Sequence, residues 1–507
     1  MRAQALTART VETGTSTRTV AMVIRSATGA ALIGYLVDLV VIPLVVRRVG
    51  ATTYGIWAAG ASILAIAALA DVGVRTEVGR RVAAAMGTGD RVALRSAVQL
   101  GASILTLVAI PLAVVGWFAA PLIRGFLLPG GAAGESAAEL DLFLRLIVVA
   151  GAITVVGNGY FGVLRGVQRN DVETRAVLIG SVVGAGVTLG AALGGAGLWS
   201  LAAGWAVQTS LQLLLEWRGT RHIVPDLRFR LLRIRPSLMR PFLALSGLVL
   251  LSQVSDVIDT QWDKLVLSHF VGPAAVASFQ LGTMLVLQAK ALAVLPLTPL
   301  LTAVSELGRA RASEARLIYV RLERTSLAVG ATVLSAAFAF GPAFVQLWLG
   351  AEFTPAGRVV RLLVVAVAIN LYAAPLALRA FGEGAHRLPG IASLVNVVIN
   401  GVLSVVLASR IGLDGALYGS IAGNVAGTAI FMVLMRRRSG GEWRWPSLRS
   451  MSLGAALGCG LMFAHAGDIS TWPVLIAAAG LYATAMLPLC LKLEGTSLRG
   501  VLRGTAA

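Results

Sequence analysis

The chain has 507 residues, of which 57% are hydrophobic and only 13% are charged. Soluble globular domains carry about 25% charged residues, so this composition excludes an ordinary water-soluble protein. The formal net charge of +19 indicates either a nucleic-acid partner, because basic chains attract phosphates, or the basic cytoplasmic loops of a membrane protein.

The N-terminal segment, residues 1–19, is polar and carries arginines ahead of the first apolar run. This arrangement is similar to the basic start of a signal peptide, but the run over 20–46 is far longer than a signal core. The run also contains Arg25 and Asp38. We therefore predict that 20–46 is retained as the first membrane span and that 1–19 is a cytoplasmic segment.

Apolar runs of spanning length recur along the rest of the chain. A span needs about 20 mostly apolar residues, and lipid offers no partner to an open backbone, so each span is predicted to be a helix. The sequence predicts an all-α integral membrane protein with about 14 transmembrane helices. The predicted spans are 20–46, 53–74, 96–119, 142–164, 173–194, 198–216, 241–270, 274–303, 320–341, 357–380, 389–408, 412–435, 450–466 and 473–491.

The basic residues of the chain concentrate in alternate loops. Cytoplasmic loops of membrane proteins are enriched in Lys and Arg, and the connection at 217–240 is especially rich in arginine, whereas Glu135 and Glu139 lie in an opposite loop. Membrane topology therefore accounts for the positive charge, and no nucleic-acid partner is expected. An even number of spans puts both termini on one side, and the basic loops predict that this side is cytoplasmic.

Three short sequence patterns occur twice and in the same order, which indicates an internal repeat. Chance similarity among segments rich in Ala, Val and Leu is the alternative. Because six helices return the chain to its starting side, such repeats would be parallel, as in many transporters. The pairs are Val49-Gly50 with Val271-Gly272, the six residues from Arg145 with those from Arg361, and Gly197-Leu198 with Gly412-Leu413.

The repeat predicts how the chain is divided. No connection is long enough to hold a separate soluble domain of about 50 residues. The predicted parts are an N-lobe at 20–216, a basic cytoplasmic linker at 217–240, a C-lobe at 241–435, two further helices at 450–491 and a cytoplasmic tail at 492–507.

Acidic residues form a stripe in the predicted span 241–270. Asp256, Asp259 and Asp263 recur at helical spacing and so share one helix face. Three carboxylates cannot all stay ionised in a dry site, so protons, cations or basic side chains must neutralise them. The stripe is either a coupling-ion or gating site in a transport cavity, or a set of ion pairs or water-facing residues. Lys264, beside it, is a candidate for binding substrate.

Three further charges are predicted inside the hydrocarbon. A charge at the centre of a span costs about 2.5–3.5 kcal/mol, so it faces a cavity or a partner. Lys290 would bind a substrate phosphate as a point charge, or pair with Asp256 or Asp259. Arg25 would contact an anion at the inner mouth of a cavity, or reach the cytoplasmic surface. Asp38 is a candidate coupling-ion or gating carboxylate.

Motifs for catalysis or metal binding are absent from the sequence. It contains no Walker loop for ATP, and Cys459 and Cys490 stand alone in apolar runs. No large outer loop offers a catalytic carboxylate. We expect neither an enzyme nor a bound cofactor or metal, and the coupling ion, H⁺ or Na⁺, is left open.

Six segments carry a resemblance to a known family. In chain order they are Val49–Trp57, Leu69–Val74, Asp263–Leu265, Phe270–Ala275, Leu347–Phe353 and Gly412–Ala416. Together they resemble the polysaccharide transporter family of the multidrug/oligosaccharidyl-lipid/polysaccharide flippase superfamily. The resemblance covers nearly the whole chain, although Pro273 departs from the family pattern. It implies two six-helix lobes in a V around a central cavity, with two extra C-terminal helices, and export of undecaprenyl-linked or similar glycolipids by alternating access.

The resemblance and the intramembrane charges predict a flippase that moves a polyprenyl-phosphate-linked saccharide to the outer leaflet for cell-surface polysaccharide biosynthesis. Its expected partners are that substrate, membrane lipids, a polysaccharide polymerase and glycosyltransferases, and the protein is expected to be a monomer. The alternatives are a proton- or sodium-coupled exporter of drugs or metabolites from the same superfamily, and a non-transporting scaffold for cell-wall enzymes.

Overall fold

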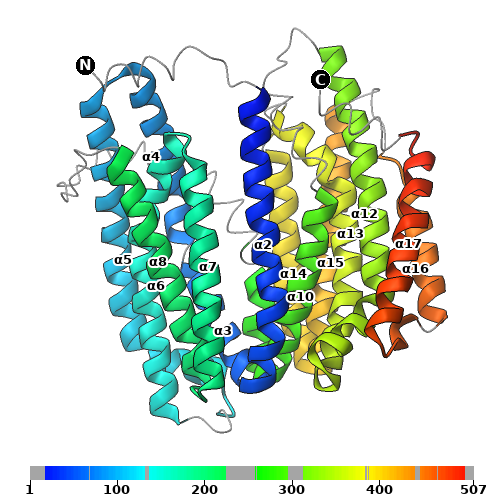
Figure 1. Ribbon diagram of the computed structural model, residues 1–507, viewed down its shortest axis with the longest axis horizontal. Helices are drawn as coiled ribbons and strands as arrows, with labels where there is room; N and C mark the ends of the chain where they lie inside the picture. The colour runs from blue at the N-terminus through cyan, green and yellow to red at the C-terminus, as the bar shows by residue number, and fades with distance from the viewer. Residues whose placement is uncertain are drawn as a thin grey trace. The chain divides into compact units, whose positions relative to one another are not determined.

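The chain is an all-helical integral membrane protein (Figure 1). The structure is a computed structural model that describes residues 17–67, 69–131, 136–223, 257, 260–294, 312–382, 385, 387–439, 446–464 and 466–496. Within these ranges every regular element is a helix, which confirms the predicted class. Nine helices of the described part are long and apolar enough to cross a membrane. The total of about 14 spans remains a prediction.

The order of the helices follows the predicted order of spans. A further helical stretch covers 260–270. The helices are α2 (Thr17–Val49), α3 (Ala51–Ala67), α4 (Leu69–Thr88), α5 (Arg91–Leu127), α6 (Ala137–Gly166), α7 (Asn170–Leu193), α8 (Leu198–Ile223), α10 (Pro273–Val294), α12 (Ala312–Leu349), η3 (Ala351–Phe353), α13 (Thr354–Gly382), α14 (Arg387–Ile411), α15 (Leu413–Ser439), α16 (Arg449–Phe463), η5 (Ala466–Asp468) and α17 (Trp472–Leu493).

Several helices are longer than the apolar runs that predicted them. Helix α5 has 37 residues, whereas the apolar run predicted only 96–119. At 1.5 Å per residue such a helix is about 55 Å long, well beyond the hydrocarbon thickness of about 30 Å. Its first turns carry Arg91 and Arg95, so the helix continues into the polar region, where apolar periodicity gives no signal.

One side of α5 carries a row of exposed apolar residues. Leu107, Ile110, Val114 and Phe118 are spaced three or four residues apart and are all more than half exposed. Residues at this spacing share one helix face. A continuous exposed apolar face on a soluble protein would promote association, whereas in a membrane it contacts lipid.

Breaks between helices recur at the repeated sequence patterns. Gly50 and Gly272 have φ of +84° and +115°, and Gly197 and Gly412 have φ of +51° and +67°. Glycine adopts positive φ without the penalty that a β-carbon brings. In each case a helix begins at the next residue. The repeated patterns therefore mark the same kind of helix start in both halves of the sequence.

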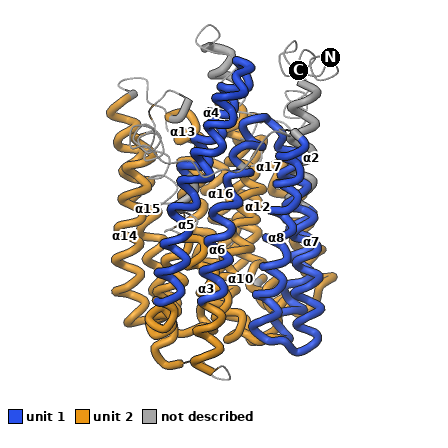
Figure 2. The backbone as a smooth tube through the Cα atoms, turned by 90° about the vertical axis from the view of Figure 1, so that its left-hand side faces the viewer, with its two compact units in different colours: residues 1–48, 67–118, 145–249 blue, residues 49–66, 119–144, 250–507 orange. Residues whose placement is uncertain are grey.

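The described contacts divide the chain into two compact units, coloured separately in Figure 2. Unit 1 comprises residues 1–48, 67–118 and 145–249, and unit 2 comprises residues 49–66, 119–144 and 250–507. The contacts therefore divide the chain differently from the sequence repeat, because they group 49–66 and 119–144 with the later helices. Most of the predicted linker at 217–240 lies outside the described residues.

In unit 1, helices α4, α5 and α6 share an apolar core that includes Val78, Leu105 and Val155. Helix α7 packs along α8. The approach is close at Gly184, where a β-carbon would lie 2.8 Å from the carbonyl oxygen of Gly204.

In unit 2, segments from the first third of the sequence contact the stretch 260–273. The Ser268 hydroxyl donates to the carbonyl oxygen of Leu127 over 2.7 Å, and the ring of His269 stacks on Phe126 with centroids 4.8 Å apart. These contacts explain why residues 119–144 group with the later helices. On another side of unit 2, α16 and α17 pack against α12.

Candidate functional site

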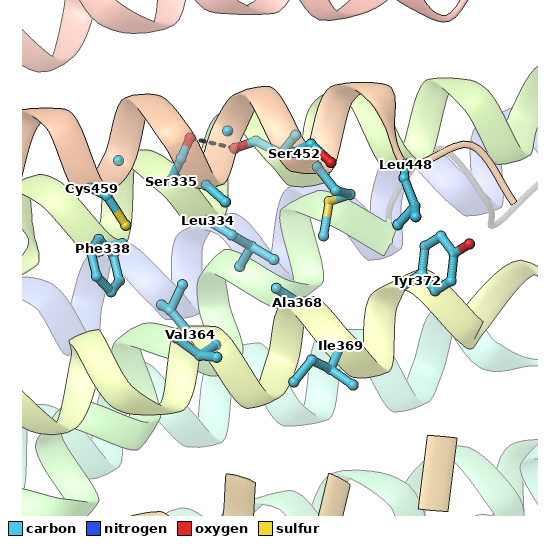
Figure 3. A pocket seen from close by; sticks show the side chains of 16 residues that line it. Leu334, Ser335, Phe338, Val364, Ala368, Ile369, Tyr372, Leu448, Ser452 and Cys459 are labelled. Carbon is cyan, nitrogen blue, oxygen red and sulfur yellow. Dashed lines mark hydrogen bonds between the residues drawn. The ribbon is translucent and has the colours of Figure 1, made fainter. Parts of the chain in front are cut away.

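Two cavities in unit 2 are candidates for a binding site. The larger, about 450 Å³, lies between α12, α13 and α16. Figure 3 shows Tyr372 and Leu448 at one end and Phe338 and Cys459 at the other. Most of its lining is aliphatic or aromatic, and none of the residues that line it carries a charge. It therefore offers little to a saccharide or a phosphate.

The smaller cavity, about 190 Å³, is polar and contains charge. It lies among α10, α13, α14, α15 and the helical stretch 260–270, all in unit 2. Two of the predicted site residues, Asp263 and Lys290, line it together. The polar side chains in its lining are Thr260, Asp263, Thr283, Lys290, Asn370, Ser393, Asn396, Ser420 and Asn424.

Asp263 is the acidic group of this cavity. Its side chain is fully buried, and its Oδ2 accepts a hydrogen bond of 2.5 Å from the Ser420 hydroxyl. The Asn424 side-chain amide donates to the Ser420 carbonyl oxygen over 2.9 Å. A buried carboxylate is stable only with hydrogen bonds or a cation. The Ser420 hydroxyl of α15 therefore stabilises Asp263, and Asn424 is bonded to the backbone of the same serine.

Close packing of α14 on α15 builds the amide-rich wall of the cavity. A β-carbon at Gly419 would lie 2.7 Å from the backbone nitrogen of Ser404, so glycine is needed at this crossing. The Ser404 hydroxyl donates to Asn400 Oδ1 over 2.8 Å. With the two backbones so close, Asn396 and Asn424 can line the same small space.

Lys290 is the basic group of the cavity. It shares one face of α10 with Thr283 and Leu287, which also line the cavity, since positions i, i+4 and i+7 align on a helix. Among the residues that the structure describes, none forms an ion pair with Lys290. A lysine that lines such a cavity attracts an anion as a compact point charge.

The remaining predicted site residues are not placed at this cavity. Lys264 is buried, its Nζ donates to Gln261 Oε1 over 2.8 Å, and it is not among the lining residues. Asp38 is exposed on α2. Arg25 belongs to α2, but its side chain lies outside the described residues. Asp256 and Asp259 also lie outside the described residues.

The amides of the cavity carried no functional prediction. On sequence grounds Asn370, Asn396 and Asn424 are expected only to form hydrogen bonds between helices. Their spacing in the sequence could have predicted a shared site, because Asn396 and Asn424 lie at comparable distances on either side of the turn at Gly412. Side chains so placed on an antiparallel helix pair lie at a similar depth, where they can form one site.

Replacing Ser420 with alanine is expected to destabilise unit 2, because Asp263 loses its hydroxyl donor. A hydrogen bond to a charged group contributes about 1.5–3 kcal/mol. Thermal unfolding of the purified protein in detergent would measure the loss. Ser409→Ala is the control, since Ser409 is exposed and its hydroxyl donates to the Val406 carbonyl of its own helix, with no other partner among the described residues. Equal unfolding midpoints for the two variants would contradict the prediction.

Solved membrane transporters share this fold. The lipid II flippase MurJ in an inward closed conformation aligns with a TM-score of 0.70 and 11% identity, covering 92% of this chain and 97% of that chain. An inward-facing multidrug resistance MATE transporter of the MOP superfamily aligns with a TM-score of 0.63 and 16% identity, covering 80% and 94%. A MOP superfamily transporter from Pyrococcus furiosus, described as having a binding pocket of reverse polarity, gives 0.56 and 15%, covering 82% and 94%. At these identities the likeness is one of fold.

The sequence itself identifies the family. No curated protein sequence matches the chain. A family model described as polysaccharide biosynthesis protein matches residues 24–307, which is more than half of the 507 residues. The match agrees with the resemblance carried by the segments at Val49 and Asp263. The chain therefore belongs to the polysaccharide biosynthesis protein family.

Proposed function

We propose that this protein is a flippase that moves a polyprenyl-phosphate-linked saccharide from the inner to the outer leaflet of a bacterial cytoplasmic membrane by alternating access. Lys290 carries the proposal, because its ammonium lines a polar intramembrane cavity and has no ion-pair partner in the described part of the chain. The family description and the fold shared with a lipid II flippase support it.

The cavity chemistry suits the head group of such a substrate. The Lys290 ammonium would bind phosphate, and the amides of Asn370, Asn396 and Asn424 would both donate to and accept from sugar hydroxyls. Sites for drug-sized ligands occupy about 300–1,000 Å³, so a cavity of about 190 Å³ would hold one phosphate or one sugar ring. The rest of the substrate, including its lipid tail, would lie outside this cavity.

A proton- or sodium-coupled exporter of the same superfamily is the second candidate. Asp263 favours it, since a buried carboxylate in the same cavity would attract a cationic drug or a coupling ion. A scaffold for cell-wall enzymes is the third candidate, but such a protein has no need of buried charges facing a cavity.

Deletion of the gene separates these candidates. For the flippase, the lipid-linked saccharide is expected to accumulate in the inner leaflet, where a membrane-impermeant label added outside cannot reach it. The wild-type gene on a plasmid should restore labelling. Normal labelling, combined with new sensitivity to cationic dyes, would contradict the flippase and support the exporter.

A further inference from the structure

Unit 1 contains a buried acidic side chain that the candidate site does not use. Glu216 lies on α8 and is fully buried, with an exposed fraction of 0%. It stands seven residues before the helix ends at Ile223, about 10 Å along the helix axis at 1.5 Å per residue.

The two carboxyl oxygens of Glu216 have unequal surroundings. Oε1 accepts a hydrogen bond of 3.1 Å from the Gln212 side-chain amide. Oε2 is buried and has no hydrogen-bond partner within the described part of the chain, and the same holds for the hydroxyl of Thr220 one turn further along α8. One neutral amide is too little to stabilise a buried carboxylate, because an ion loses its hydration on burial.

The charged groups around Glu216 do not compensate for this lost hydration. Glu173 on α7 disfavours a negative charge on Glu216, whereas Arg75 on α4 favours one. Arg75 forms no ion pair with Glu216 among the described residues, and Glu173 is itself paired with Arg165 at 3.5 Å. On α8 itself, the guanidinium carbon of Arg221 lies 4.8 Å from the centroid of the Trp217 ring.

Another buried carboxyl of unit 1 shows the opposite arrangement. Glu77 on α4 is only 3% exposed, but its oxygens accept hydrogen bonds of 2.7 Å from Arg80 and Arg81. The hydrogen bond from Arg80 holds the pKa of Glu77 below its usual value, so this side chain is a carboxylate. Within the described residues, the same unit thus contains one buried glutamate with two cationic partners and one without an ion-pair partner.

We propose that Glu216 is a proton-binding site of unit 1, neutral in this conformation with its proton on Oε2. Loss of the proton would leave a buried charge whose one hydrogen bond from the described residues comes from Gln212. Release therefore requires that water reach the carboxyl, which links the opening of the α7–α8 region to pH. This inference goes beyond the proposed function and is independent of the substrate.

Infrared spectroscopy of the full chain in lipid nanodiscs, without any substrate, tests the proposal. The wild-type protein at neutral pH is expected to show the carbonyl stretch of a protonated carboxyl, with a shift in D₂O. Glu216→Gln should remove that band. Glu77→Gln is the matched control and should leave it, because Glu77 is already ionised. A spectrum of Glu216→Gln that retains the whole band would overturn the proposal.

Thermal unfolding against pH gives a second readout on the same variants. As the pH rises from the pKa of an ordinary glutamate, about 4.3, towards neutral, the wild-type protein should lose stability, because the unfolded chain releases this proton while the buried Glu216 keeps it. Glu216→Gln should not show that loss. A Glu216-dependent signal that responds to Na⁺ at constant pH, and not to pH, would mean that a metal cation is bound, which would also overturn the proposal. Neither measurement depends on export, so either result leaves the proposed function standing.

Discussion

Replacement of Lys290 by alanine is expected to lower export of the lipid-linked saccharide at least about tenfold, with normal amounts of protein in the membrane. A contact between a charged group and its partner contributes about 1.5–3 kcal/mol, which corresponds to roughly ten- to hundredfold in rate. The loss should fall on transport and not on folding, because no described residue depends on Lys290 for an ion pair. External labelling of the saccharide in a deletion strain would measure it.

Matched variants separate the charge of Lys290 from its shape. Lys290→Arg keeps the charge and should retain part of the export. Lys492→Ala removes an exposed lysine in the last turn of α17 and should have no effect. The sequence also predicts that Arg25 contacts the anion, so Lys290→Ala combined with Arg25→Ala should abolish export. Full export by this double variant would refute the assignment of both cations.

Local sequence signals predicted the helices because each span contains its own apolar run. The repeated sequence patterns contain Gly50, Gly197, Gly272 and Gly412, and in the structure each of these glycines has a positive φ just before a helix begins. Asp263 and Lys290 stood out because a charge inside an apolar run is conspicuous at the level of sequence. Features that depend on one segment alone were therefore predictable.

Features that depend on packing between distant segments could not be predicted from the sequence. The apolar run over 53–74 ends well before Thr88, the last residue of α4, whose buried Val78 and Val82 belong to the core shared with α5 and α6. Glu216 ends the predicted span 198–216 and would be expected near water. It is fully buried in unit 1, where α7 packs along α8, and no local pattern encodes that packing.

Replacement of Gly55 by alanine is expected to be the most destabilising glycine-to-alanine change among the described glycines of unit 2. Gly55 on α3 faces the backbone carbonyl of Pro273, the first residue of α10, and a β-carbon at Gly55 would overlap that carbonyl. A backbone group cannot rotate away as a flexible side chain can, so α3 and α10 must separate. Overpacking of this kind costs about 1–3 kcal/mol, and more where the neighbour is rigid.

Gly480→Ala is the matched control for this change. Gly480 lies inside α17, and a β-carbon there would meet no atom within 4 Å, so the variant should be neutral or slightly more stable, as expected when alanine replaces glycine in a helix. Thermal unfolding of both proteins in detergent makes the comparison. Ser268 lies five residues before the start of α10. Separation of α3 from α10 should therefore also weaken the hydrogen bond between the Ser268 hydroxyl and the Leu127 carbonyl. An unfolding midpoint for Gly55→Ala equal to that of Gly480→Ala would show that the two backbones do not approach this closely.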